Sequence, residues 1–242
     1  MAILVTRPGK DGIELCHNLT QRGYNALHHP LITIAEGHEL TQLRTELAQY
    51  DMMMAVSQPA VNLTQQYLQS QGLSWPTGAI YLAIGQKTAQ VLSKACQQPV
   101  HYPEISDSEH FLELPVLQEV NQKRMVILRG NGGRELISHT LAQRGAQVCC
   151  REVYRRIELP FHAQEALPLW QQAKVDTLVI TSLHQLTFFM SQLTAHAQAW
   201  AYQQRLLVPS ERIGREAQAL GFQHIVITGS AANHDLLAAL QP

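Results

Sequence analysis

Three serines follow apolar segments of this chain at the points where those segments end: Ser57, Ser182 and Ser210. In an open α/β sheet, ligands bind at the carboxyl ends of the strands, so these hydroxyls are candidate ligand contacts. None lies in the G-x-S-x-G pattern of a serine nucleophile, which favours hydrogen bonding over covalent catalysis. Serine is also a common first residue of a helix, so capping is the alternative for each of them.

Tyr154 is a second candidate. It lies where the predicted strand 148–154 passes into a polar, extended segment, and Arg151, Arg155 and Arg156 flank it. These neighbours would place the phenol in positive surroundings at the rim of a cleft. A tyrosine that only packs is the alternative, and the sequence does not decide between the two.

A glycine-rich turn follows another apolar segment, 124–128. It reads Arg129-Gly130-Asn131-Gly132-Gly133-Arg134 and leads into a helical pattern. Successive backbone N–H groups in such a turn can hold an anion. The third glycine of a dinucleotide-binding fingerprint would fall at Glu135, and no phosphate-binding G-x-x-x-x-G-K-[ST] occurs, so nucleotide binding is disfavoured.

The elements that position these groups occur twice along the chain. Residues 4–9 and 19–23 align with 126–131 and 141–145 at an offset of 122, and residues 51–57 align with 176–182 at an offset of 125. Repeats this long indicate two related domains rather than a solenoid. Strand and helix patterns alternate throughout, which predicts parallel sheets covered on both faces. Leucines 40, 43 and 47 have helical spacing and predict one helix there.

We therefore predict two duplicated α/β domains with parallel sheets, similar to flavodoxin or Rossmann folds. The first domain is discontinuous, with residues 1–35 plus 158–242, and the second spans 37–153. Segments 33–38 and 152–158 would form a two-stranded linker between them. The ligand loops of both domains would then face one cleft.

Composition narrows the class of protein. The net charge of −1 does not favour nucleic acid as a partner, although 13 of the 18 basic residues are arginine, which suits carboxylate or phosphate contacts. The apolar runs are far shorter than the ~20 residues of a membrane span, and we see no secretory signal, so we expect a cytoplasmic protein. The histidines and the four cysteines lack metal or redox spacing, so we expect no metal site and reduced thiols.

Seven short motifs also occur in order along essentially the whole chain. They are Leu-Val-Thr-Arg-Pro at 4–8, Val-Ser-Gln-Pro-Ala-Val at 56–61, Ala-Ile-Gly-Gln-Lys-Thr-Ala at 83–89, Ser-Asp-Ser-Glu at 106–109, Leu-Arg-Gly-Asn-Gly-Gly-Arg-Glu at 128–135, Val-Tyr-Arg-Arg at 153–156 and Thr-Ser at 181–182. Each motif is loose by itself. The ordered set resembles the uroporphyrinogen-III synthase family.

The resemblance implies a two-domain lyase that acts on the linear tetrapyrrole hydroxymethylbilane without cofactor or metal. The enzyme expels the terminal hydroxyl as water, inverts ring D and closes the macrocycle. By resemblance Tyr154 assists the departure of the hydroxyl. The residues that would bind or orient the substrate are Arg7, Ser57, Thr88, Gly130, Asn131, Ser182, Ser210 and Arg212. We expect a monomer that binds no nucleic acid or membrane and makes transient contact with the enzyme that produces hydroxymethylbilane.

Two other classes stay open from the sequence. A two-lobed binding protein for an anionic small ligand would use the same strand-end donors without chemistry. In a fused or regulatory module without chemistry, the strand-end donors would have no ligand in common. Product formation from hydroxymethylbilane distinguishes the enzyme from both.

Overall fold

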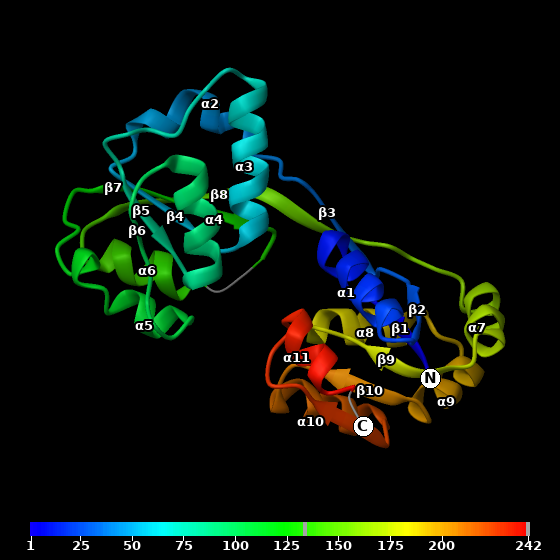
Figure 1. Cartoon of the computed structure of the whole chain (residues 1–242). Helices are drawn as coiled ribbons and strands as arrows, with labels where there is room; N and C mark the ends of the chain where they lie inside the picture. Colours follow the sequence, from blue (N-terminus) through cyan, green and yellow to red (C-terminus); the bar gives the residue numbers. More distant parts are fainter. Residues whose placement is uncertain (133–134, 241–242) are drawn as a thin grey trace. The chain divides into compact units, whose positions relative to one another are not determined.

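The chain forms two compact units in a computed structural model that describes residues 1–132 and 135–240. One unit comprises Met1–Thr33 with Ile157–Pro242, and the other comprises Ile34–Arg156 (Figure 1). The first unit is therefore built from two separate stretches of chain. Each unit contains its own largely parallel sheet with helices packed against it, which confirms the predicted α/β class.

The first unit has a five-stranded sheet in the order β11-β10-β9-β1-β2, in which every pair is parallel. Its strands are β1 (Ala2–Val5), β2 (Asn25–His28), β9 (Val175–Val179), β10 (Arg205–Val208) and β11 (His224–Ile227). Its helices are α1 (Gly9–Gln21), α7 (Ala163–Gln172), α8 (Leu183–Gln192), α9 (Ala195–Tyr202), α10 (Glu211–Leu220) and α11 (Asn233–Ala238). Since β1 lies between β2 and β9, the two stretches of chain are joined at the centre of the sheet.

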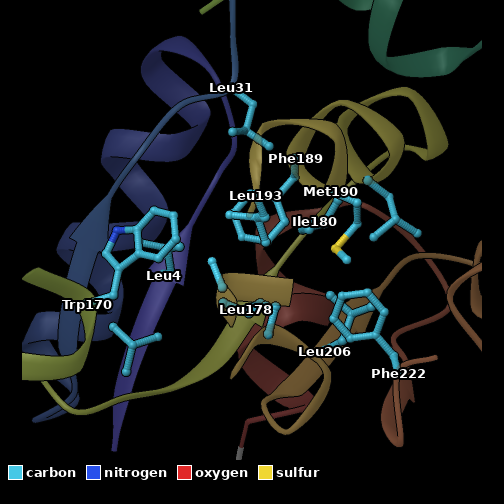
Figure 2. Packing of buried hydrophobic residues seen from close by; sticks show 14 of the residues in the cluster. Leu4, Leu31, Trp170, Leu178, Ile180, Phe189, Met190, Leu193, Leu206 and Phe222 are labelled. Carbon is cyan, nitrogen blue, oxygen red and sulfur yellow. The ribbon is translucent and has the colours of Figure 1, made fainter. Parts of the chain in front are cut away.

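Apolar side chains cover both faces of this sheet. On one face Leu4 and Leu178 from the strands meet Trp170 of α7 and Phe189 of α8 (Figure 2). On the other face a separate cluster packs α1 and α11 against the strands. The predicted burial of the sheet on both sides follows from these two clusters.

The second unit has a six-stranded sheet in the order β3-β8-β7-β4-β5-β6. Its strands are β3 (Ile32–Glu36), β4 (Met52–Ala55), β5 (Ile80–Ala83), β6 (Val100–His101), β7 (Arg124–Gly130) and β8 (Gln147–Glu158). Its helices are α2 (Leu43–Glu46), α3 (Gln58–Ser70), α4 (Gln86–Cys96), α5 (Ser108–Leu112) and α6 (Leu136–Gln143), with short 3-10 helices η1 (Leu40–Gln42), η2 (Leu47–Gln49) and η3 (Pro115–Leu117). One apolar cluster packs α2, α3 and α4 on one face, and another packs α5 and α6 on the opposite face.

The two sheets repeat one topology. Five strands of the second sheet, in the order β6-β5-β4-β7-β8, correspond one to one with the strands of the first sheet, in the order β11-β10-β9-β1-β2. The pairs β1 with β7 and β4 with β9 are those that the sequence offsets of 122 and 125 predict. The second sheet adds β3 beside β8, and the passages of the chain between units, after Thr33 and after Arg156, fall in these two neighbouring strands.

Two local predictions need correction. The segment with Leu40, Leu43 and Leu47 is not one helix but η1, α2 and η2 in succession, with all three leucines buried. A spacing of three or four residues fits a 3-10 turn as well as an α-helix, and no side chain caps any of the three pieces. The strand predicted at 148–154 and the extended segment that follows it are a single 12-residue strand, β8.

Among the described residues no helix is long and apolar enough to cross a membrane.

Candidate active site

The carboxyl ends of β4 and β7, together with the adjacent part of β8, bring four of the predicted site residues together. Ala55 at the end of β4 pairs with Leu128 of β7, so Ser57 lies beside the end of β7. The β7–β8 register shifts between Arg129 and Gly130, and this irregularity sets Gly130 opposite Tyr154. A bulge of this kind re-aims the side chains that follow it.

The ring of Tyr154 lies across Gly130. A Cβ atom built on Gly130 would be 2.5 Å from two atoms of the ring, so only glycine leaves room for it. The phenol oxygen of Tyr154 accepts a hydrogen bond from Ser57 Oγ at 3.0 Å. Tyr154 is 1% exposed and packs in the core between the sheet and α3, so it is both a packing residue and a polar one.

Arg156 makes the second polar contact with the phenol. Its Nη2 donates to the phenol oxygen of Tyr154 at 2.9 Å, and its guanidinium carbon lies 5.2 Å from the ring centroid. Asn131 fixes the backbone of Arg156, because Asn131 Oδ1 accepts from Arg156 N at 2.7 Å and Asn131 Nδ2 donates to Arg156 O at 3.2 Å. Gly130, Asn131 and Arg156 therefore hold the phenol in one orientation.

This arrangement suits proton donation. A phenol has one proton and can also accept hydrogen bonds at its oxygen. Since Ser57 and Arg156 both donate to that oxygen, the phenol proton is left for another acceptor. The positive charge of Arg156 is placed to stabilise the phenolate that remains after the proton is given away.

Ser57 has two roles at once. It is the residue that begins α3, and its Oγ accepts from Ala60 N at 3.4 Å, as expected for a helix cap. Its hydroxyl proton goes to Tyr154. Ser57 can therefore cap helix α3 and still take part in the site.

A cavity of about 160 Å³ opens on the other face of the same sheet edge. Its lining is Val56, Ile84, Ser108, Ile127, Arg129, Gly132, Ile137, Ser138 and Cys150. Arg129 Nη1 donates to Glu135 Oε1 at 2.7 Å, and hydrogen bonds from Arg129 and from Ser138 lower the pKa of the Glu135 carboxyl. A small apolar group with a polar end fits this lining.

Comparison with known proteins assigns the chain to a family. The sequence model described as Uroporphyrinogen-III synthase HemD matches residues 14–238. The uroporphyrinogen-III synthase of Escherichia coli (strain K12) is 42% identical over 248 aligned positions that cover 100% of both chains. The protein of the same name from Salmonella typhimurium is 40% identical over 246 positions, again covering 100% of both.

This chain belongs to the uroporphyrinogen-III synthase family. Two solved structures of the family share its fold. A mutant uroporphyrinogen III synthase from Thermus thermophilus superimposes with a TM-score of 0.66 at 19% identity, covering 100% of this chain and 99% of that one. The uroporphyrinogen-III synthetase from Helicobacter pylori gives a TM-score of 0.61 at 13% identity, with 99% of each chain covered.

Arg7, which the synthase resemblance placed in substrate binding, has its guanidinium engaged within the first unit. Its Nη1 donates to the carbonyl of Ala231 and, at 2.7 Å, to Asn233 Oδ1. Its Nη2 forms an ion pair with Asp11 at 2.9 Å. These contacts tie the turn after β1 to the start of α11, so Arg7 acts here as a structural link.

The other first-unit residues assigned from the synthase family lie at helix starts. Ser182 begins α8 and its Oγ accepts from Gln185 N at 3.2 Å. Ser210 begins α10 without a side-chain cap, and Arg212 lies exposed in the first turn. Within the described residues neither Ser210 nor Arg212 has a side-chain hydrogen bond or ion pair, so this helix start is the freer of the two.

Thr88 lies buried in the first turn of α4, beside the strand edge that carries Ser57. In the described part of the chain it shares no hydrogen bond with Tyr154 or Ser57. Gly133 and Arg134 of the glycine-rich motif lie outside the described residues. Across those residues no group of three or more His, Cys, Asp or Glu side chains could hold a metal ion.

In the sequence Arg156 was only one of three arginines that flank Tyr154 and was not distinguished from the other two. A strand places residues two apart on the same face, so Tyr154 and Arg156 share a face. Arg151 instead forms ion pairs with Glu46 and Glu39. The two-residue spacing was the signal that could have selected Arg156.

Proposed function

We propose that this chain forms uroporphyrinogen III from hydroxymethylbilane, with inversion of ring D and loss of water. The observation that supports this most is the Tyr154 phenol, which is oriented by Ser57 and Arg156 at the strand edge. The family membership of the whole chain supports the same reaction. The family membership favours an enzyme, a cyclising lyase, over a two-lobed binding protein that would use the same strand-end hydrogen-bond donors.

In the proposed first step Tyr154 gives its proton to the terminal hydroxyl of the bilane. The bond between that oxygen and its carbon breaks with the electron pair passing to oxygen, and water leaves. A cationic azafulvene and a phenolate remain, and Arg156 stabilises the phenolate. Attack by ring D on this cation begins ring inversion, and the proton released when the macrocycle closes restores the phenol. Positioning of the two reacting ends then decides between the ring-inverted and the non-inverted product.

The acetate and propionate groups of the substrate require hydrogen-bond donors. In the first unit we propose Ser182, Ser210 and Arg212, because helix starts and arginine suit carboxylates. In the second unit we propose Thr88 as a donor. We propose that Gly130 and Asn131 act indirectly, by positioning Tyr154 and Arg156, because Asn131 N already donates to Tyr154 O at 3.2 Å. We propose that Arg7 serves this function indirectly, by fixing the turn after β1.

We further propose a monomer in the cytoplasm that needs neither metal nor cofactor and that contacts the enzyme producing hydroxymethylbilane only transiently. These proposals rest on the sequence expectations. Activity that persists in the presence of a chelator would support independence of metal, and a sedimentation coefficient of a monomer would support the monomeric state. A requirement for metal would overturn the proposal that the enzyme needs none.

The proposed function is tested by incubating purified protein with freshly prepared hydroxymethylbilane, oxidising the products and separating the type I and type III porphyrins. Tetrapyrrole binding is measured on the same preparation. We expect predominantly type III product. Binding with only the type I product, at the spontaneous rate, would favour the binding protein.

A further inference from the structure

Arg156 is the group that a ligand approaching Tyr154 meets first. Tyr154 is 1% exposed, whereas the Arg156 side chain is exposed and lies over the phenol ring. A guanidinium has five N–H donors in a fixed fork, and one nitrogen, Nη2, is engaged with the phenol oxygen. Donors on the rest of the fork are left for a second acceptor.

The charge of Arg156 has no acidic partner within residues 1–132 and 135–240. Within the same residues Arg212 is unpaired as well. Arg7 instead pairs with Asp11, Arg129 with Glu135 and Arg151 with Glu46. The backbone of Arg156 is nevertheless fixed from both sides by Asn131. A fixed but unpaired guanidinium beside a buried phenol is suited to an anionic ligand group.

We infer that Arg156 is a positioning residue that binds a carboxylate of the substrate and, with Nη2, orients the Tyr154 phenol. One side chain thereby links substrate binding to the acid that acts on it. This inference rests on the proposed function, because it assigns Tyr154 the proton transfer described above. The proton leaves the phenol for the departing hydroxyl, and the negative charge left on the phenol oxygen faces Nη2.

The test compares wild type, Arg156→Gln, Arg156→Lys, Tyr154→Phe and the double variant Tyr154→Phe with Arg156→Gln, using hydroxymethylbilane as substrate. Arg124→Gln is the matched control. It removes the same charge from an exposed position at the opposite end of β7, where the ligand loops do not lie. Thermal unfolding followed by circular dichroism checks that each variant is folded.

We expect Arg156→Gln to raise KM about tenfold and to lower kcat about tenfold, the range for a lost hydrogen bond to a charged group. Tyr154→Phe should lower kcat about 100-fold. In the Tyr154→Phe background, Arg156→Gln should still raise KM but lower kcat by less than about twofold, because the phenol it orients is gone. Arg156→Lys should keep KM within about threefold of wild type, since the charge is retained.

Two results separate the inference from the proposed function. A kcat loss from Arg156→Gln that is equal in both backgrounds, or matched by Arg124→Gln, would overturn the positioning role of Arg156 while leaving Tyr154 in place. Full turnover by Tyr154→Phe would instead overturn the proposed role of the phenol.

Discussion

At the residue scale, the phenol of Tyr154 reaches Ser57 because Gly130 has no side chain. The ring starts on β8, passes over Gly130 of β7 and meets a hydroxyl that follows β4. The glycine is therefore needed for close approach and not for an unusual backbone angle. This explains why a glycine opens the loop, which the sequence pattern by itself attributed to anion binding.

Gly130→Ala tests this reading. The added Cβ would lie 2.5 Å from the Tyr154 ring, so the ring must move, and overpacking of this kind costs about 1–3 kcal/mol. We expect a lower unfolding temperature and a large loss of type III product. Gly78→Ala is the control, since a Cβ there meets nothing within 4 Å. Equal behaviour of the two variants would contradict the packing role of Gly130.

The partners of Tyr154 show which part of the site the sequence could predict. Ser57, Gly130 and Asn131 follow or end strands, and Tyr154 ends the strand that the sequence predicts at 148–154. Parallel neighbours place such residues at one edge, so their association was predictable. The engagement of Arg7 with α11 was not. It depends on a contact between residues more than 200 positions apart, which a pattern read along the chain does not encode.

At the element scale, α5 begins with an acid and a histidine that share a proton-sensitive contact. Asp107 caps the helix, accepting from His110 N at 2.8 Å and contacting His110 Nδ1 at 2.7 Å. Hydrogen bonds from the backbone and ring of His110 lower the pKa of the Asp107 carboxyl. The hydrogen bond with Asp107 raises the pKa of His110.

These shifts predict a pH window for stability. The contribution of His110 is complete below its unfolded pKa of about 6.5 and is lost as pH rises through its raised folded value. The contribution of Asp107 is present above about pH 3.9 and is lost as pH falls through its lowered value. Asp107→Asn keeps a capping side chain but removes the charge. Its deficit in unfolding temperature should be largest between about pH 4 and 6.5, and His110→Gln should show the same window. A deficit independent of pH would contradict the ion pair.

The elements themselves were largely predictable. The apolar segment before Ser57 is β4, and Ser57, of a residue type that commonly begins a helix, lies at the start of α3. The pieces η1, α2 and η2 were not separable by pattern, because buried leucines three and four residues apart suit both kinds of helix. The register shift between Arg129 and Gly130 was also not visible, since it depends on how β7 and β8 pair.

At the scale of the whole molecule, the duplication explains why one unit is continuous and the other is not. The chain consists of four repeated segments, which contain β1–β2, β4–β6, β7–β8 and β9–β11 in chain order. The second unit is built from the two middle segments, which are adjacent in the sequence, and the first unit is built from the first and the last. All members of the two apolar clusters of the second unit lie between Ile34 and Tyr154. The apolar clusters of the first unit contain residues from both of its stretches of chain, because β1 of the first stretch pairs with β9 of the second.

A fragment of residues 34–156 should therefore fold alone. We expect the circular dichroism of an α/β protein and a single cooperative transition in urea, since its core and most of its sheet are complete. A fragment of residues 1–33 is the control and should be unfolded, because β1 lacks its partner strand β9. An unfolded 34–156 fragment would contradict the independence of this unit.

The role of Tyr154 in ring inversion is tested by the ratio of type III to type I porphyrin that wild type and Tyr154→Phe form from hydroxymethylbilane. Both proteins are used at equal concentration with chelator present. We predict mostly type III from wild type. For Tyr154→Phe we predict mostly type I, because the spontaneous reaction overtakes a slowed enzyme. Only type I from wild type would contradict the proposed activity, and type III from Tyr154→Phe at the wild-type rate would contradict the role of the phenol.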